Sequence, residues 1–81
     1  MEEPKYGKGD YIINRKSKDI AIVKEVDKKG YYHFSAYLSG MFGTLKEADK
    51  TSLFFTYQQF FEPCNDDERK IIDNAIASQH E

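Results

Sequence analysis

The stretch IAIVKEVDKKGYYHFSAYL, which runs from Ile20 to Leu38, decides the fold. Its first seven residues are rich in β-branched side chains, which is typical of a strand. We expect the buried side chains of this strand to be those of one parity: Ile20, Ile22 and Val26. The polar run Asp27–Lys29 then predicts a tight turn, which Gly30 can close because glycine accepts a positive φ.

The second half of the stretch, Tyr31–Leu38, alternates between two sets of side chains. The better core formers are the set Tyr32, Phe34, Ala36 and Leu38. The opposite set is Tyr31, His33, Ser35 and Tyr37. Because successive side chains of a strand point to opposite faces, this alternation predicts a second strand with one buried face. Residues 20–38 are therefore predicted to form a β-hairpin.

Short strands are predicted on both sides of the hairpin. Before it, Gly9–Arg15 runs from a Gly-Asp turn into β-branched and aromatic residues. After it, Leu53–Tyr57 predicts a strand and Phe60–Glu62 predicts another. Between the hairpin and these strands, Thr44–Glu47 fits the Thr-x-x-Glu capping box, which predicts a short helix over residues 45–50.

The C-terminal segment predicts one helix, from about residue 66 to about residue 77. Asn65 is a favoured N-cap, and Glu68 follows three residues later, where its side chain can complete a capping box. The first turn is acidic, which the helix dipole favours. The helix carries one apolar stripe, made of Ile71, Ile72, Ala75 and Ile76. A single stripe indicates that the helix lies on the sheet with its other face in solvent.

A chain of 81 residues makes one domain, 1–81, and excludes a two-domain enzyme or a (β/α)₈ barrel. Short consecutive strands in so small a chain predict an antiparallel, strongly bent sheet. We therefore expect a mainly β, α+β fold. Its form is a small antiparallel SH3-like β-barrel over about residues 8–62 with one C-terminal α-helix.

The composition limits which cellular compartment and which classes of partner we expect. No apolar run approaches the roughly 18–20 residues that a membrane span needs, and the acidic N-terminus shows no secretory signal. The single cysteine excludes an internal disulfide framework, which favours a reducing, cytoplasmic location. The net charge of −2 argues against a protein devoted to non-specific nucleic-acid binding.

No residue pattern predicts catalysis. His33, His80 and Cys64 are too few and too far apart for a zinc site. Cys64 precedes a helix N-terminus, which lowers a thiol pKa, but the carboxylates at 66–68 oppose that effect. Gly7–Asp10 contains two glycines and a lysine but precedes a strand, whereas a phosphate-binding loop needs a following helix. We therefore expect a protein that is not an enzyme and holds no metal and no cofactor.

Two stretches resemble known proteins. Lys8–Ile13, followed by Ile20–Val23, resembles the opening of SH3-like barrels of the KOW type, in which a Gly-Asp pair starts the first strand. Phe60–Lys70 resembles the ending of many small uncharacterised proteins of bacteriophages and gut-bacterial mobile elements. Those proteins finish with an aromatic strand, a polar cap, an acidic first turn and one helix. The resemblance implies the SH3-like fold and a phage or mobile-element neighbourhood, and it carries over no established activity. From that neighbourhood we form the hypothesis that the partner is a host enzyme or defence nuclease and that the effect is inhibition.

The aromatic content points to binding. Six Tyr and six Phe exceed what a 9.5 kDa core readily hides, and large exposed side chains dominate interface energies. We expect Met41 and Phe42, between two glycines on a predicted loop, to anchor a protein partner. A second candidate surface is the acidic face of the helix, with Asp66, Asp67 and Asp73 presented to a basic partner. A sheet edge in so small a domain also favours a homodimer.

The alternative function is single-stranded nucleic-acid binding by an SH3-like module. Tyr31, His33 and Tyr37 share one face of the predicted strand and would add to the partner-binding surface. Exposed rings beside the lysines of the neighbouring turns would form a stacking platform for bases. The RNA-recognition signature Lys-Gly-aromatic begins at Lys29 but fails at Tyr32.

Overall fold

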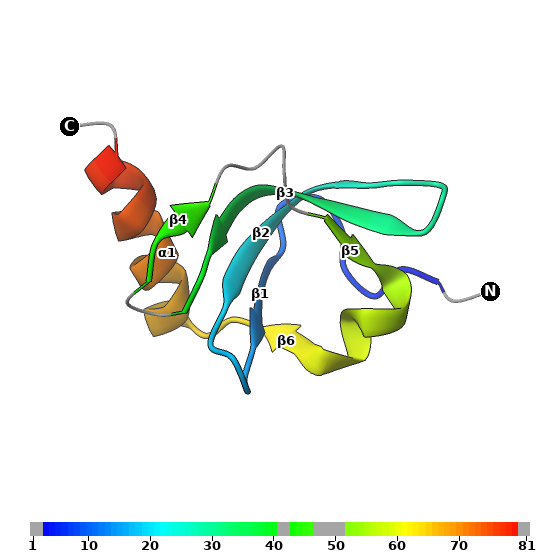
Figure 1. The fold of residues 1–81 in the computed structure, drawn as a ribbon, viewed down its shortest axis with the longest axis horizontal. Helices are drawn as coiled ribbons and strands as arrows, with labels where there is room; N and C mark the ends of the chain where they lie inside the picture. The colour runs from blue at the N-terminus through cyan, green and yellow to red at the C-terminus, as the bar shows by residue number, and fades with distance from the viewer. Residues whose placement is uncertain (1–2, 41–42, 47–51, 80–81) are drawn as a thin grey trace.

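The computed structural model describes residues 3–40, 43–46 and 52–79, and Figure 1 shows their path. Met41 and Phe42 lie outside the described residues, as do residues 47–51. The elements are β1 (Tyr11–Asn14), β2 (Ile20–Val26), β3 (Tyr31–Leu38), β4 (Leu45–Lys46), β5 (Ser52–Phe54), the 3₁₀ helix η2 (Phe55–Phe60), β6 (Phe61–Pro63) and α1 (Asp66–Gln79). Within these residues, no helix is long and apolar enough to cross a bilayer.

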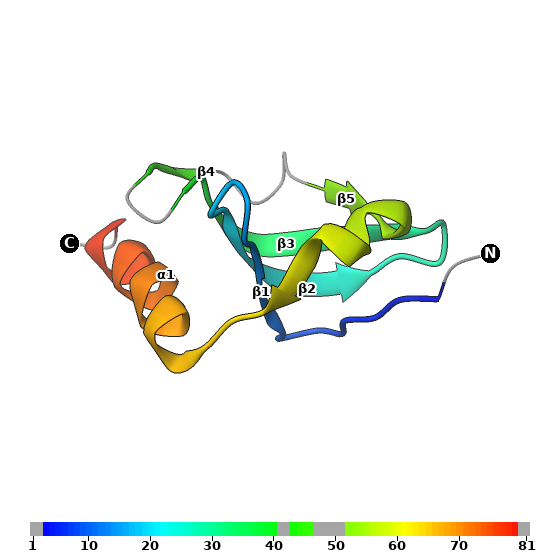
Figure 2. The ribbon, with the colours of Figure 1, turned by 90° about the horizontal axis from the view of Figure 1, so that it is seen from below.

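The strands form one antiparallel sheet in the order β4-β3-β2-β1-β6, and β5 pairs with the same strand as β4, at the other end of β3. The predicted mainly β, α+β fold with one C-terminal helix is confirmed. The predicted closed barrel is wrong, because no described strand bridges β6 to β4 or β5. The chain between β5 and β6 forms η2, so it makes no ladder that could close the seam. Figures 1 and 2 show α1 at one end of the sheet and η2 at the other.

The hairpin is confirmed at its predicted residues. β2 and β3 have the predicted bounds, Gly30 has a φ of +98°, and the buried face of β3 is the predicted one. The parity predicted for β2 is wrong, because Ala21 and Val23 are buried while Ile22 is only half-buried. The register of β2 against β3 shifts on both sides of Val23, which breaks the simple alternation.

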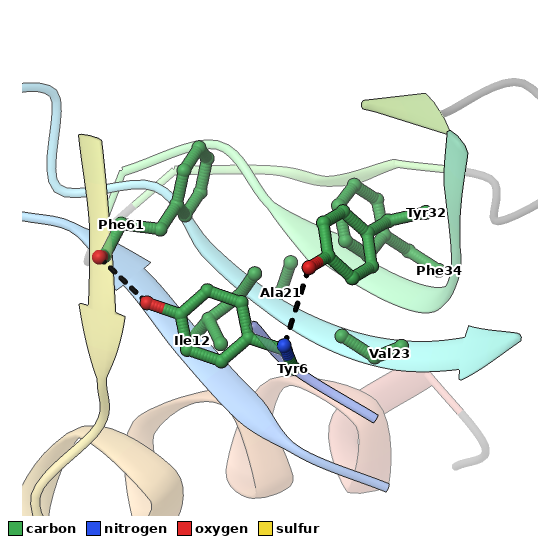
Figure 3. Packing of buried hydrophobic residues seen from close by; sticks show 7 residues of the cluster. All are labelled: Tyr6, Ile12, Ala21, Val23, Tyr32, Phe34 and Phe61. Atoms are coloured by element: carbon green, nitrogen blue, oxygen red, sulfur yellow. Dashed lines mark hydrogen bonds between the residues drawn. The ribbon is translucent and has the colours of Figure 1, made fainter. Parts of the chain in front are cut away.

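The buried residues form two clusters. The first consists of Tyr6, Ile12, Ala21, Val23, Tyr32, Phe34 and Phe61, which Figure 3 shows from close by. The second consists of Ile13, Ile20, Ala36, Leu38 and Ile72. Adjacent residues such as Ile12 and Ile13 enter different clusters, because successive side chains of a strand point to opposite faces. Both faces of β1 and of the first half of β2 are therefore covered.

Two predicted elements on the C-terminal side of the hairpin differ in the structure. Leu45–Lys46 is a short strand against β3 and not the start of a helix. The strand predicted over 53–57 ends at Phe54, where η2 begins. The Phe55 amide donates to the Gly30 carbonyl (2.9 Å), and the Phe55 ring packs against Tyr32 (4.8 Å between centroids). These contacts bend the chain where the sequence favours a straight strand.

The predicted helix and its capping box are confirmed, with α1 running two residues beyond position 77. The Glu68 amide donates to Asn65 Oδ1 and the Asn65 amide donates to Glu68 Oε1, both at 2.9 Å. Glu68 is only 2% exposed, and its other oxygen accepts a hydrogen bond from the Arg15 guanidinium at the end of β1. Arg15 also bonds Glu62 (2.8 Å), so one side chain joins β1, β6 and α1.

We predict that Glu68→Ala lowers the free energy of unfolding by about 2 kcal/mol, because it removes the cap of the Asn65 amide and a buried carboxylate partner. Glu62→Ala is the matched control, since Glu62 also binds Arg15 but is exposed and caps no helix. Urea unfolding followed by circular dichroism measures both changes. Equal losses in the two variants would contradict the role given to the buried carboxylate.

Candidate binding surface and cavity

Two large rings are exposed side by side on η2. Tyr57 is 49% exposed and Phe60 is 56% exposed. Their ring centroids lie 6.4 Å apart with a stacked interplanar angle of 29°. A 3₁₀ helix repeats every three residues, so residues 57 and 60 point the same way. We call Tyr57 and Phe60 the ring pair.

The helix that carries the ring pair is held by Gln58, which lies between the two rings in sequence. The Gln58 Oε1 accepts hydrogen bonds from the Tyr32 hydroxyl and from the Lys5 amide (2.7 Å), and its Nε2 donates to the Glu3 carbonyl (2.8 Å). This one amide therefore binds the backbone of the N-terminal arm, residues 3–6, on both its donor and acceptor sides. Gln58 faces the arm, and the two rings of the ring pair are about half exposed.

The N-terminal arm is fixed further by two tyrosines, as Figure 3 shows. The Tyr6 amide donates to the buried Tyr32 hydroxyl (3.2 Å), and the Tyr6 hydroxyl donates to the Phe61 carbonyl in β6 (2.7 Å). Burial raises the pKa of Tyr6, with Tyr32 as the next cause. The arm thus joins β3 to β6 through hydrogen bonds that involve two tyrosine hydroxyls.

The other rings whose side chains the structure describes divide equally between buried and half-buried positions. The buried rings are Tyr6, Tyr32, Phe34 and Phe61. The half-buried rings are Tyr11, Tyr31, Tyr37 and Phe55. The excess that the composition predicts lies on η2, whereas the sequence pattern predicts two strands there, 53–57 and 60–62. The predicted anchor of Met41 and Phe42 lies outside the described residues and stays a prediction.

The predicted platform of Tyr31, His33 and Tyr37 does lie on one face of β3, and all three side chains are half-buried. Tyr31 and His33 are 6.4 Å apart between centroids, and His33 Nε2 lies 3.1 Å from an Asp27 carboxylate oxygen. The Tyr37 hydroxyl donates to Asp19 (2.8 Å), and burial strongly raises its pKa. The carboxylates of Asp27 and Asp19 therefore bind the side chains of His33 and Tyr37.

The three predicted acidic residues of α1 are exposed but do not act alike. Asp66 and Asp67 lie in the first turn, where they complement the helix dipole. Asp73 accepts a hydrogen bond from the Tyr11 hydroxyl (2.7 Å), which raises the pKa of Tyr11. Asp73 therefore also fastens the helix to β1.

A cavity of about 340 Å³ lies where the arm, β1, β6 and α1 meet. It is lined by Lys5, Tyr6, Gly9, Asp10, Tyr11, Pro63, Cys64 and Arg69. No sequence pattern indicates this cavity, because the four segments that form its walls come together only through tertiary packing. No group of three or more potential metal ligands occurs among the residues that the structure covers.

Cys64 lies in the wall of this cavity as a half-buried free thiol. Burial, with the Glu68 carboxylate second, raises the pKa of the thiol to about 11. The two cationic neighbours, Arg15 and Arg69, act in the opposite direction but more weakly. The thiol is therefore protonated at neutral pH. Burial therefore outweighs the lowering of the thiol pKa that is expected from the N-terminus of α1, which follows Cys64.

Comparison with family models, curated proteins and solved structures gives no match.

We predict that iodoacetamide alkylates native Cys64 about a hundredfold more slowly at pH 8 than the same residue in urea, because a pKa of about 11 instead of 9.0 cuts the thiolate fraction by that factor. The native rate should still be rising with pH above 9, since the thiolate forms only near the raised pKa. Mass spectrometry of timed samples measures both rates. Similar rates in the native and unfolded chains would contradict the raised pKa.

Proposed function

We propose that this chain is a small non-enzymatic binding protein that acts through protein–protein contacts, with the ring pair as its anchor. The observation that carries the proposal is the exposure of Tyr57 and Phe60, at 49% and 56%, on a helix that Phe55 and Gln58 connect to Tyr32. Tyrosine and phenylalanine are enriched in interface cores, and a rigid aromatic side chain buries much area at a low cost in entropy.

The setting of the ring pair favours a preorganised contact. Gln58 is bonded to Tyr32 and to the backbone of the arm, so the helix between the two rings is fixed before a partner arrives. A surface that is already ordered loses less entropy on association than a flexible loop. Polar side chains flank the rings, with Thr56 and Gln59 exposed on the same helix, as in the polar rim of a protein interface.

The same proposal includes the type of fold and the class of partner. The first and last strands in the chain, β1 and β6, are neighbours in the sheet. The register shifts beside Val23 bend β2. Both features support an SH3-like arrangement that is open at one seam. The resemblance of Phe60–Lys70 to phage and mobile-element proteins supports a host enzyme or defence nuclease in the cytoplasm as the partner, with inhibition as the effect.

A protein partner is favoured over a nucleic acid by the carboxylates beside the predicted platform. Asp27 is bonded to His33 and Asp19 is bonded to Tyr37, so each of these rings has a negative charge next to it. Such charges repel phosphates, and the chain as a whole is already negative. The geometry gives single-stranded nucleic acid the weaker support of the two candidates.

We predict that the double variant Tyr57→Ser with Phe60→Ser keeps its fold and loses partner binding by at least about thirtyfold, because truncating one interface anchor costs about 2 kcal/mol. The matched control replaces Thr56 and Gln59, exposed on the same helix, by serine and alanine. The immobilised full chain is incubated with extract of the organism that encodes it, and quantitative mass spectrometry compares the captured proteins.

The proposal requires proteins that the wild type and the control retain and the double variant does not. Identical capture by all three chains would contradict it. Binding of labelled single-stranded DNA or RNA at low salt, lost steeply as salt rises, would replace it with the alternative function.

A further inference from the structure

The cavity beside α1 presents two cations, Lys5 and Arg69, that form no ion pair with the acidic side chains that the structure describes. The Arg69 guanidinium lies over the Tyr11 ring, 4.7 Å from its centroid, and Lys5 Nζ lies 5.7 Å from the centroid of Tyr6. Within residues 3–40, 43–46 and 52–79, the ion pairs involve Arg15 and His33, and neither Lys5 nor Arg69 takes part in one.

Contact with a ring holds a cation in place without using its hydrogen-bond donors. The five N–H donors of Arg69 and the three of Lys5 form no side-chain hydrogen bond within the described part of the chain, so they remain available to a ligand. A guanidinium over a ring still offers its planar fork of N–H donors, which matches the two oxygens of a carboxylate.

The two tyrosine hydroxyls and the Asp10 carboxylate in the cavity walls already form hydrogen bonds within the chain. The Tyr6 hydroxyl donates to the Phe61 carbonyl, and the Tyr11 hydroxyl donates to Asp73, one helical turn beyond Arg69. Asp10 accepts the Gly7 amide through Oδ2 (2.8 Å). Besides its cations and the Asp10 carboxylate, the cavity offers the carbon surface of two rings and Pro63, together with the Cys64 thiol.

We propose that this cavity binds a small organic carboxylate, a monoanion with an aromatic or apolar body. The two cations and the Asp10 carboxylate leave one net positive charge in the walls, which balances one carboxylate. A phosphate dianion would carry more negative charge than the site neutralises, and it would face Asp10 with a further unpaired charge. The rings and Pro63 cover the body of the ligand.

The volume agrees with a ligand of this size. About 340 Å³ lies at the small end of the range of ligand pockets, roughly 300–1,000 Å³, and it fits a single ring with one acidic group. The cavity lies at the junction of the arm and α1, whereas the ring pair lies on η2. The proposal is therefore independent of the proposed protein partner.

The test is a titration of the ¹⁵N-labelled full chain with benzoate, followed by amide chemical shifts. We expect saturable shifts at Gly9, Asp10 and Cys64, with a Kd of about 1 mM or tighter, as suits a fragment-sized ligand. Benzamide, which has the same shape without the charge, should bind at least about tenfold more weakly because a charge-assisted hydrogen bond is lost. Inorganic phosphate should bind more weakly than benzoate.

Variants of Lys5 and Arg69 test whether these two cations are responsible for benzoate binding. Arg69→Gln and Lys5→Gln should each weaken benzoate binding by about tenfold, while Lys70→Gln, next to Arg69 on the helix but outside the cavity, should change it by less than about twofold. The spectrum of each variant without ligand shows whether the chain is folded, and Arg69→Lys keeps the charge if Arg69→Gln does not fold. Non-saturating shifts, equal binding of benzoate and benzamide, phosphate binding tighter than benzoate, or unchanged binding by both Gln variants would overturn the proposal.

Discussion

The hydroxyl of Tyr32 is the contact on which the rest of this structure depends. It is carried by a fully buried ring in β3, yet it accepts hydrogen bonds from the Lys5 amide (2.7 Å) and the Tyr6 amide (3.2 Å) and donates to Gln58. A buried polar group must be satisfied, because an unpaired one costs about 1–3 kcal/mol. Here its satisfaction brings together three segments that are distant in sequence: the arm, the hairpin and η2.

Both candidate sites follow from this contact. The bond to Gln58 fixes η2, so that the side chains at 57 and 60 are directed outward. The bonds to the arm place Lys5 and Tyr6 at the edge of the cavity, across from the first turn of α1. The capping box and the Arg15 bridge hold α1 from the other side. A small open sheet thus acquires a defined surface at each end without closing into a barrel.

The hairpin and α1 could be predicted from the sequence, because residues close together in the chain determine both. The hairpin follows from its alternation and Gly30, and α1 follows from Asn65, Glu68 and one apolar stripe. The composition of residues 53–57 favours a strand, but the packing of Phe55 on Tyr32 bends the chain into η2. The bulge around Val23 and the cavity depend on contacts across the sheet, which a periodic pattern does not contain.

The replacement Tyr32→Phe tests this account most directly, because it removes only the hydroxyl and leaves the ring. Hydrogen exchange measured by NMR should show faster exchange at the Tyr6 amide, whose bond to the hydroxyl is lost, with a smaller change at Lys5, which keeps its bond to Gln58. Stability should fall by about 1–3 kcal/mol. Tyr37→Phe removes a hydroxyl from the same strand and should leave the arm unchanged. Unchanged exchange at Tyr6 in Tyr32→Phe would contradict the account.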